Sequence, residues 1–208
     1  TGAFLSLNLA QHVGDNPEDV RKNRATLERE IGHPIQYMNQ VHGDQIAEIR
    51  QLLDVEPTAD GLITSTTEIA LAVMVADCIP LLLGNKSSVA AVHVGRRGLV
   101  NNIALVALSK MWAIDSSPIT AVIGPTICGN CYEVSEEIYT EVVDQFPLAQ
   151  ARTQSGTLAL DLTKALKSLL INQGVKVIDE SLCTVEESSL YSYRRDGVTG
   201  RQAGVVWL

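Results

Sequence analysis

The chain has 208 residues, of which 46% are hydrophobic and 19% charged, and its formal net charge is −8. This length suits one substantial domain and is short for two, and the composition is typical of a globular protein with a well-filled core. The negative charge argues against an extended nucleic-acid surface, and no apolar run approaches the roughly 20 residues that span a bilayer. We therefore expect a protein that binds neither nucleic acid nor a membrane.

The chain contains four cysteines and four histidines. A domain of this size does not need disulfides, and the cysteine spacing is not that of a secreted scaffold. Residues 1–8 lack the basic and apolar regions of a secretory signal. We therefore expect reduced thiols and a cytoplasmic location. Because histidines are few, any metal site must use very few imidazoles.

The first elements follow from capping signals and apolar runs. Residues 3–9 predict a short strand, and Asn16 followed by Pro17 predicts the start of a helix that ends at Gly32. Glycine in the His42–Asp44 stretch permits a bulge that turns a side chain out of a sheet. The other strands predicted outside the central hairpin are 35–41, 45–49, 69–76, 119–123, 175–178 and 203–208. The later predicted helices are 99–112, one from about Ser135 and one capped by Asp161.

The central stretch runs from Ala76 to Gly98 and contains two apolar runs separated by a polar loop at Gly84–Ser88. This pattern predicts a hairpin of buried strands in a sheet that is covered on both faces. Cys78 opens the first run and His93 lies near the end of the second. The hairpin would therefore place a thiol and an imidazole at one rim of the sheet.

His42, in the sequence NQVHGD, would complete a three-ligand metal site with Cys78 and His93. Catalytic zinc sites use three protein ligands and leave one position open. A second hypothesis makes Cys78 a nucleophile that His93 activates. A purely structural interpretation is also open at this point, because free cysteine packs as a small hydrophobe.

Cys128 and Cys131 form a CxxC pair, which is typical of redox chemistry or of half a zinc site. The chain has no second CxxC and few histidines. We therefore favour two ordinary thiols in a turn.

Two arginine-rich segments stand out in an acidic chain. Residues 193–201 carry three arginines between glycines, and arginine forks suit phosphate or carboxylate groups. The alternative is a solvated hairpin with its turn at Asp196-Gly197. Arg96 and Arg97 lie beside a predicted helix start, which is a natural anion site.

Eight motifs, taken together and in order, resemble the YfiH family, whose members are also named laccase-domain, multicopper polyphenol oxidoreductase or purine nucleoside phosphorylase YfiH-type proteins. The resemblance covers nearly the whole chain and implies a single catalytic domain over 1–208. It implies an α+β fold of mixed β-sheets packed together with helices on the outside, and a preceding strand that is clipped here. The motifs are SLNLAQHVGDNPEDVRKNR, NQVHGD, ADGLIT, ADCIPLLL, AVHVGRRGL, IGPTICGNCYEV, LDLTKAL and SYRRDGVTGRQAGVVWL.

The resemblance implies that His42, Cys78 and His93 bind a catalytic zinc, with copper possible in its place. A multicopper oxidase is excluded because four histidines cannot supply several copper sites. Arg96 stands where the family usually has tryptophan, and we expect it to alter the pocket wall.

The resemblance further implies a zinc-dependent purine nucleoside enzyme, in which the metal would activate water for attack at the purine C6. The implied reactions are phosphorolysis of adenosine, inosine and methylthioadenosine, and deamination of adenosine. We expect Asn8 and Gln40 to hold substrate hydroxyls and Arg194 and Arg201 to hold phosphate, in a monomer or homodimer. The alternatives are an amidase that edits UDP-muramoyl-amino-acid cell-wall precursors and a non-catalytic zinc-binding module.

Overall fold

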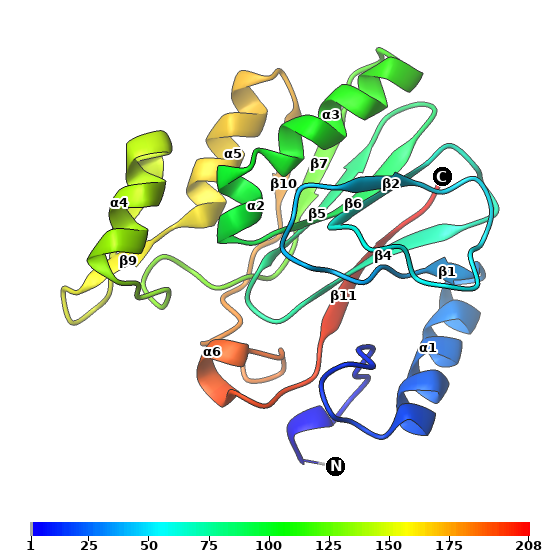
Figure 1. Cartoon of the computed structure of the whole chain (residues 1–208), viewed down its shortest axis with the longest axis horizontal. Coiled ribbons are helices and arrows are strands. Elements are labelled where there is room, and N and C mark those ends of the chain that lie inside the picture. Colours follow the sequence, from blue (N-terminus) through cyan, green and yellow to red (C-terminus); the bar gives the residue numbers. More distant parts are fainter. Residues whose placement is uncertain (1) are drawn as a thin grey trace.

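Two mixed β-sheets pack face to face at the centre of the computed structural model, which describes residues 2–208 (Figure 1). Thr1, the first residue of the predicted domain, lies outside the described residues. The larger sheet has six strands in the order β10-β7-β5-β6-β3-β2, and the smaller has three in the order β1-β4-β11. Strands β8 and β9 form a separate ribbon. The bounds are β1 Ile35–Gln36, β2 Ile46–Glu48, β3 Gly61–Thr64, β4 Ala70–Val75, β5 Ile79–Gly84, β6 Val89–Val94, β7 Thr120–Ile123, β8 Gln150–Arg152, β9 Leu158–Leu160, β10 Lys176–Asp179 and β11 Gln202–Val206.

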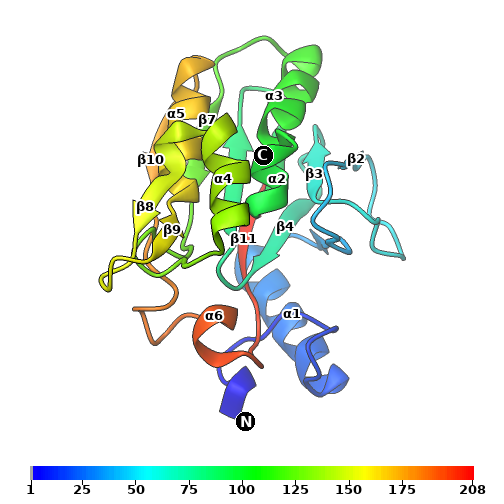
Figure 2. The same ribbon diagram turned by 60° about the vertical axis from the view of Figure 1, so that its left-hand side comes forward.

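Helices cover the outer faces of both sheets, as the turned view also shows (Figure 2). Helix α1 packs its Leu27 and Ile31 against the smaller sheet, whereas α3 and α5 supply the apolar residues on the larger one. The predicted fold of mixed sheets packed together with helices outside is confirmed. The helices are α1 Pro17–Ile31, α2 Arg96–Val100, α3 Ile103–Ile114, α4 Glu136–Gln145, α5 Leu162–Asn172 and α6 Tyr193–Asp196, with 3₁₀ turns at Gly2–Phe4 and Pro147–Ala149.

Capping explains where α1 begins and ends. The Asn16 side chain accepts a hydrogen bond from the amide of Glu18, Pro17 occupies the first turn, and Gly32 ends the helix with φ 75°. Ser135 and Asp161 cap α4 and α5 in the same way. These helix starts were therefore predicted correctly.

The predicted hairpin is confirmed as β5 and β6. The two strands pair antiparallel, with Pro80 opposite His93 and Ile79 opposite Val94. All six residues of β6 are buried, because the smaller sheet covers one face of the hairpin and α3 the other. Cys78 thus lies immediately before β5, level with the end of β6.

Two local predictions and one alternative were wrong. Residues 3–9 do not form a strand, because Ser6 and Leu7 both have positive φ and the chain turns there. The predicted helix 99–112 begins earlier, at Arg96, and is broken at Asn102, which has φ 57°. The hairpin turn considered as an alternative at Asp196-Gly197 is instead the end of α6, a single helical turn.

The predicted strand 35–41 also shortens to two residues, for a reason that matters for the site. The Gln40 side chain takes over the pairing with β4, since its Nε2 donates to the Met74 carbonyl at 2.8 Å and its Oε1 accepts from the Met74 amide at 2.9 Å. The chain is therefore tied to β4 while its backbone turns away toward His42. Among the described residues, no helix is long and apolar enough to cross a membrane.

Candidate metal centre

His42, Cys78 and His93 converge from three separate segments, and we call them the His–Cys–His centre. Their ligand atoms all lie within 4.8 Å of one another, and the Cys78 Sγ is 4.0 Å from the His42 Nε2. The two imidazole rings meet edge to face, with centroids 4.7 Å apart. His93 is buried, Cys78 partly buried and His42 exposed, so the centre is anchored in the core and open on one side.

A buried carboxylate, Asp60, organises two of the three donors. Its oxygens accept hydrogen bonds from the amides of Val41, His42 and Gly43, at 3.2, 2.9 and 2.6 Å. The same carboxylate accepts the Nδ1–H of His93 at 2.8 Å. This bond leaves the His93 Nε2 as the ring atom available to a metal, an arrangement typical of histidine ligands.

The electrostatics of the centre favour an ionised thiol. Burial raises the pKa of Cys78, but hydrogen bonds and charge from His42 and His93 outweigh it and lower that pKa to about 6. Burial lowers the pKa of His93, yet its contacts with Asp60 and Cys78 raise it to about 9. A thiolate is the form of cysteine that binds metals and acts as a nucleophile.

The backbone around Cys78 is held by residues far along the chain. Asp77 has φ 97°, a conformation uncommon for a residue with a side chain. Its carboxylate accepts hydrogen bonds from Thr184 Oγ1 at 2.6 Å, Ser192 Oγ at 2.7 Å and the Arg194 amide at 2.7 Å. The Asp77 carboxylate therefore faces the C-terminal segment.

Two hollows meet at the centre. The first, of about 100 Å³, brings His12, Gln40 and Arg201 to the same space as the three donors. The second, of about 350 Å³, is also lined by His42 and Cys78, together with Val41, Arg96, Arg97 and Tyr132. A small molecule can therefore approach the donors from a polar, cationic side.

Of the four residues predicted to bind substrate, two line the first hollow and two do not. Gln40 and Arg201 line the hollow, whereas Asn8 is fully buried and uses its amide on Ala10, Asp15 and the Arg201 backbone. Asn8 thus positions the backbone of Arg201. The direct contact that we expected between Asn8 and substrate hydroxyls stays a prediction. The Arg194 guanidinium bonds to the carbonyls of Cys131 and Glu133, away from that hollow.

Asp60 and His12 were missed as site residues. Asp60 belongs to the ADGLIT motif, but its contact with His93 arises from the pairing of β3 with β6 and is not visible in local sequence. His12 lies in a loop without a periodic sequence pattern. Only its place in the folded structure, in the same hollow as Arg201, indicates a role. Arg96, whose presence in the pocket wall was expected, lines the second hollow and pairs with Glu141 of α4 at 2.5 Å.

The donor set fits a metal ion. Two imidazoles and one thiolate are ligands that suit zinc and also copper, and three protein ligands with an open side match a catalytic site. The buried Asp60 bonded to His93 is the support that such ligands require. The fold and this donor set together define a class of two-sheet proteins with a candidate metal centre between a hairpin and a loop.

Comparison with known proteins gives the class its family. The family described as multi-copper polyphenol oxidoreductase laccase matches residues 1–208, and the chain belongs to it. The chain is 41% identical to a protein of Corynebacterium glutamicum named purine nucleoside phosphorylase, over 99% of this chain and 88% of that protein. It is 33% identical to the purine nucleoside phosphorylase YfiH of Escherichia coli, over 99% and 87% of the two chains.

A solved structure has the same fold. The crystal structure of the Bacillus licheniformis protein YfiH superimposes with a TM-score of 0.91 at 28% identity, covering 100% of this chain and 88% of that one. The resemblance to the YfiH family is therefore confirmed along the chain.

Proposed function

We propose that the chain is a zinc-dependent purine nucleoside phosphorylase that acts on adenosine, inosine and methylthioadenosine and also deaminates adenosine. The observation that carries this proposal is the convergence of His42, Cys78 and His93 at a hollow that Arg201 also lines. The names of the relatives support the same class of enzyme, a transferase acting on small molecules.

Zinc held at the centre supplies Lewis acidity that stabilises negative charge. The protein's part is to keep the donors in place. Asp60 fixes the ring of His93 through Nδ1 and the backbone of His42 through its amide, and the contacts of Cys78 with the two histidines keep its thiol ionised. The centre is therefore preorganised before any ligand arrives.

In phosphorolysis, a phosphate oxygen forms a bond to the ribose C1′ while the bond from C1′ to the purine nitrogen breaks. Arg201 is the cation best placed to hold phosphate, since it lines the hollow and donates from Nη1 to the carbonyls of Thr199 and Gly200 at 2.9 and 2.8 Å. These bonds fix its guanidinium plane, and a fixed fork suits a phosphate group.

The electron pair of the broken bond leaves with the purine. His12 lines the same hollow, and burial followed by the charge of Arg201 lowers its pKa, so its imidazole is neutral near pH 7. A neutral imidazole offers one N–H donor and one acceptor, which suit the ring nitrogens of a purine. We assign His12 to the base and Arg201 to phosphate.

The test is incubation of the zinc-loaded protein with inosine and phosphate, followed by mass spectrometry. We expect hypoxanthine and ribose-1-phosphate in equal amounts, with formation that depends on added phosphate. Adenosine should yield adenine in the presence of phosphate and, by deamination, inosine and ammonia. Arg201→Lys should raise the KM for phosphate more than that for inosine, while the exposed Arg152→Lys should change neither.

Two results would contradict the proposal. Release of an amino acid from a UDP-muramoyl-amino-acid precursor, with nucleosides untouched, would make the protein an amidase. Stable zinc binding without turnover of any of these substrates would make it a zinc-binding module.

A further inference from the structure

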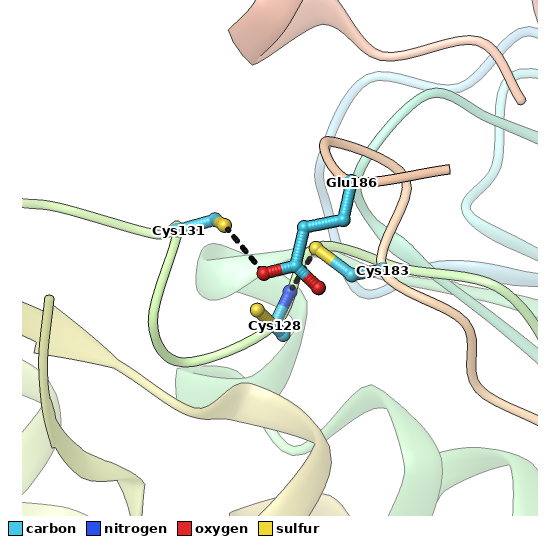
Figure 3. Close-up of side chains that lie close together, drawn as sticks. All are labelled: Cys128, Cys131, Cys183 and Glu186. Carbon is cyan, nitrogen blue, oxygen red and sulfur yellow. Dashed lines mark hydrogen bonds between the residues drawn. The ribbon is translucent and has the colours of Figure 1, made fainter. Parts of the chain in front are cut away.

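A second group of metal-binding side chains lies outside the His–Cys–His centre. Cys128 and Cys131 come from the loop between β7 and α4, and Cys183 and Glu186 from the segment between β10 and α6 (Figure 3). The three sulfur atoms and a carboxylate oxygen all lie within 4.8 Å of one another. We call these four residues the cysteine cluster.

Backbone hydrogen bonds join the two segments beside the cluster. The Thr126 amide donates to the Leu182 carbonyl at 3.0 Å, and the Thr184 amide donates to the Thr126 carbonyl at 3.1 Å. The Cys128 amide also points at the Cys183 Sγ, 3.5 Å away. The donors are therefore brought together by paired backbone.

Each segment contributes its donors at the same spacing. Cys128 and Cys131 are three residues apart, and so are Cys183 and Glu186. The amides of Cys131 and Tyr132 both donate to the Cys128 carbonyl at 3.1 Å, which closes a tight turn around the first pair. The amide of Glu187 donates to the Cys183 carbonyl at 2.8 Å and closes the second. Short paired spacings on two tight turns are typical of structural zinc sites.

We propose that the cysteine cluster is a second, structural zinc site with Cys128, Cys131, Cys183 and Glu186 as its ligands. Zinc–sulfur bonds of about 2.3 Å in a tetrahedron place sulfur atoms about 3.8 Å apart, so the donors need only a small inward movement. The Cys131 Sγ already lies 3.7 Å from the Glu186 Oε1. Three thiolates and one carboxylate complete four-coordinate zinc and leave no open position, unlike the His–Cys–His centre.

The cluster is connected to the His–Cys–His centre through Asp77. The Asp77 carbonyl accepts from the Ile127 amide at 3.0 Å and from Thr126 Oγ1 at 2.6 Å, and its carboxylate accepts from Thr184 Oγ1 at 2.6 Å. Thr126 and Thr184 flank the cluster on its two segments. A zinc ion there would lock the segments that hold the backbone next to Cys78, and would fix Tyr132 beside the second hollow.

The test counts zinc per chain by mass spectrometry of the metal, using protein purified under reducing conditions, saturated with zinc and dialysed. We expect about two zinc ions in the wild type, one for each donor set. Cys131→Ser combined with Cys183→Ser should reduce the count to about one, and Cys78→Ser should also reduce it to about one by emptying the other centre. Glu186→Gln should weaken zinc binding, whereas Glu187→Gln, a neighbouring carboxylate outside the cluster, should not.

Cobalt separates the two sites by a readout independent of activity. The thiolate-to-cobalt absorption per metal grows with the number of thiolate ligands, so the ion retained by Cys78→Ser should absorb more strongly than the ion retained by the double variant. One zinc ion in the wild type, lost in Cys78→Ser and kept in the double variant, would overturn the proposal. A disulfide within the cluster in protein purified without reductant, together with no second metal under reducing conditions, would also overturn it and assign the cluster to redox chemistry.

Discussion

The His–Cys–His centre and the cysteine cluster hold donors in two different ways. The first takes its donors from the end of a strand and two turns around it, and a buried carboxylate braces them while one side opens onto two hollows. The second takes its donors from two paired loops, with three partly buried cysteines and an exposed glutamate. Under our two proposals, the first leaves a coordination position for substrate and the second joins two segments. Their different supports are what the following experiments compare.

Loss of a metal ligand should therefore affect turnover differently at the His–Cys–His centre and at the cysteine cluster. Cys78→Ser should lower turnover on the order of 10³-fold, the size expected when a group essential to the chemistry is removed. Cys183→Ser should lower turnover at 25 °C much less, because it removes no donor of the His–Cys–His centre and only loosens a segment that contacts Asp77. Steady-state kinetics with inosine and phosphate checks both variants. Equal losses in the two would show that the cluster takes part in catalysis.

The cluster should dominate stability. A closed zinc site present at about 1,000 times its Kd adds about 4 kcal/mol, which corresponds to a melting temperature about 8–16 °C higher in a chain of this size. The double variant Cys131→Ser and Cys183→Ser should lose this increment in calorimetry with zinc present. Under chelation, the wild type and the double variant should melt at similar temperatures. An unchanged melting temperature would show that the loops need no metal.

Asp60 supports the His–Cys–His centre, so its substitution should affect metal binding at that centre. Asp60→Asn keeps the shape of the side chain but removes the charge that accepts from His93 and three backbone amides. Such a change typically lowers metal affinity by about 10–100-fold. Competition with a chelator should show this loss at the His–Cys–His centre alone. Asp44→Asn, an exposed carboxylate in the same loop, is the matched control.

The smallest expected effect is a difference in thiol reactivity with pH. In zinc-free protein, Cys78 is a thiolate above pH about 6, so its alkylation rate should change little between pH 7 and pH 9. Burial raises the pKa of Cys131. Alkylation of this thiol should therefore be slow near pH 7 and become faster only as the pH rises. Peptide mass spectrometry after brief alkylation separates the two. Zinc should protect both cysteines from alkylation. A Cys78 alkylation rate that climbs steeply above pH 7 would contradict the stabilised Cys78 thiolate.

The His–Cys–His centre was predicted from sequence only in part. The β5–β6 hairpin followed from two continuous apolar runs and a polar loop, and antiparallel pairing alone then brings Cys78 near His93. Asp60 was missed because its bond to His93 depends on the pairing of β3 with β6, which no local pattern specifies.

The cluster was missed for the same kind of reason. Cys128 and Cys131 were interpreted as ordinary thiols because nothing near them in sequence completes a site, and Cys183 reaches them only when β10 pairs with β7. The predictions for the irregular segments 3–9 and 193–201 failed for another reason. Positive φ angles and a one-turn helix in these segments are stabilised by contacts with distant residues. One example is the pair of hydrogen bonds from the Tyr191 hydroxyl to the Phe4 and Leu5 carbonyls.

Anomalous X-ray scattering at the zinc edge, from crystals grown with zinc, locates each bound ion and so shows which residues bind it. We expect one peak between the imidazoles of His42 and His93 and the Cys78 sulfur, and a second among the three sulfur atoms of the cysteine cluster. The first peak should disappear in Cys78→Ser and the second should persist. The absence of a peak at the His–Cys–His centre would contradict the assignment of His42, Cys78 and His93 as metal ligands.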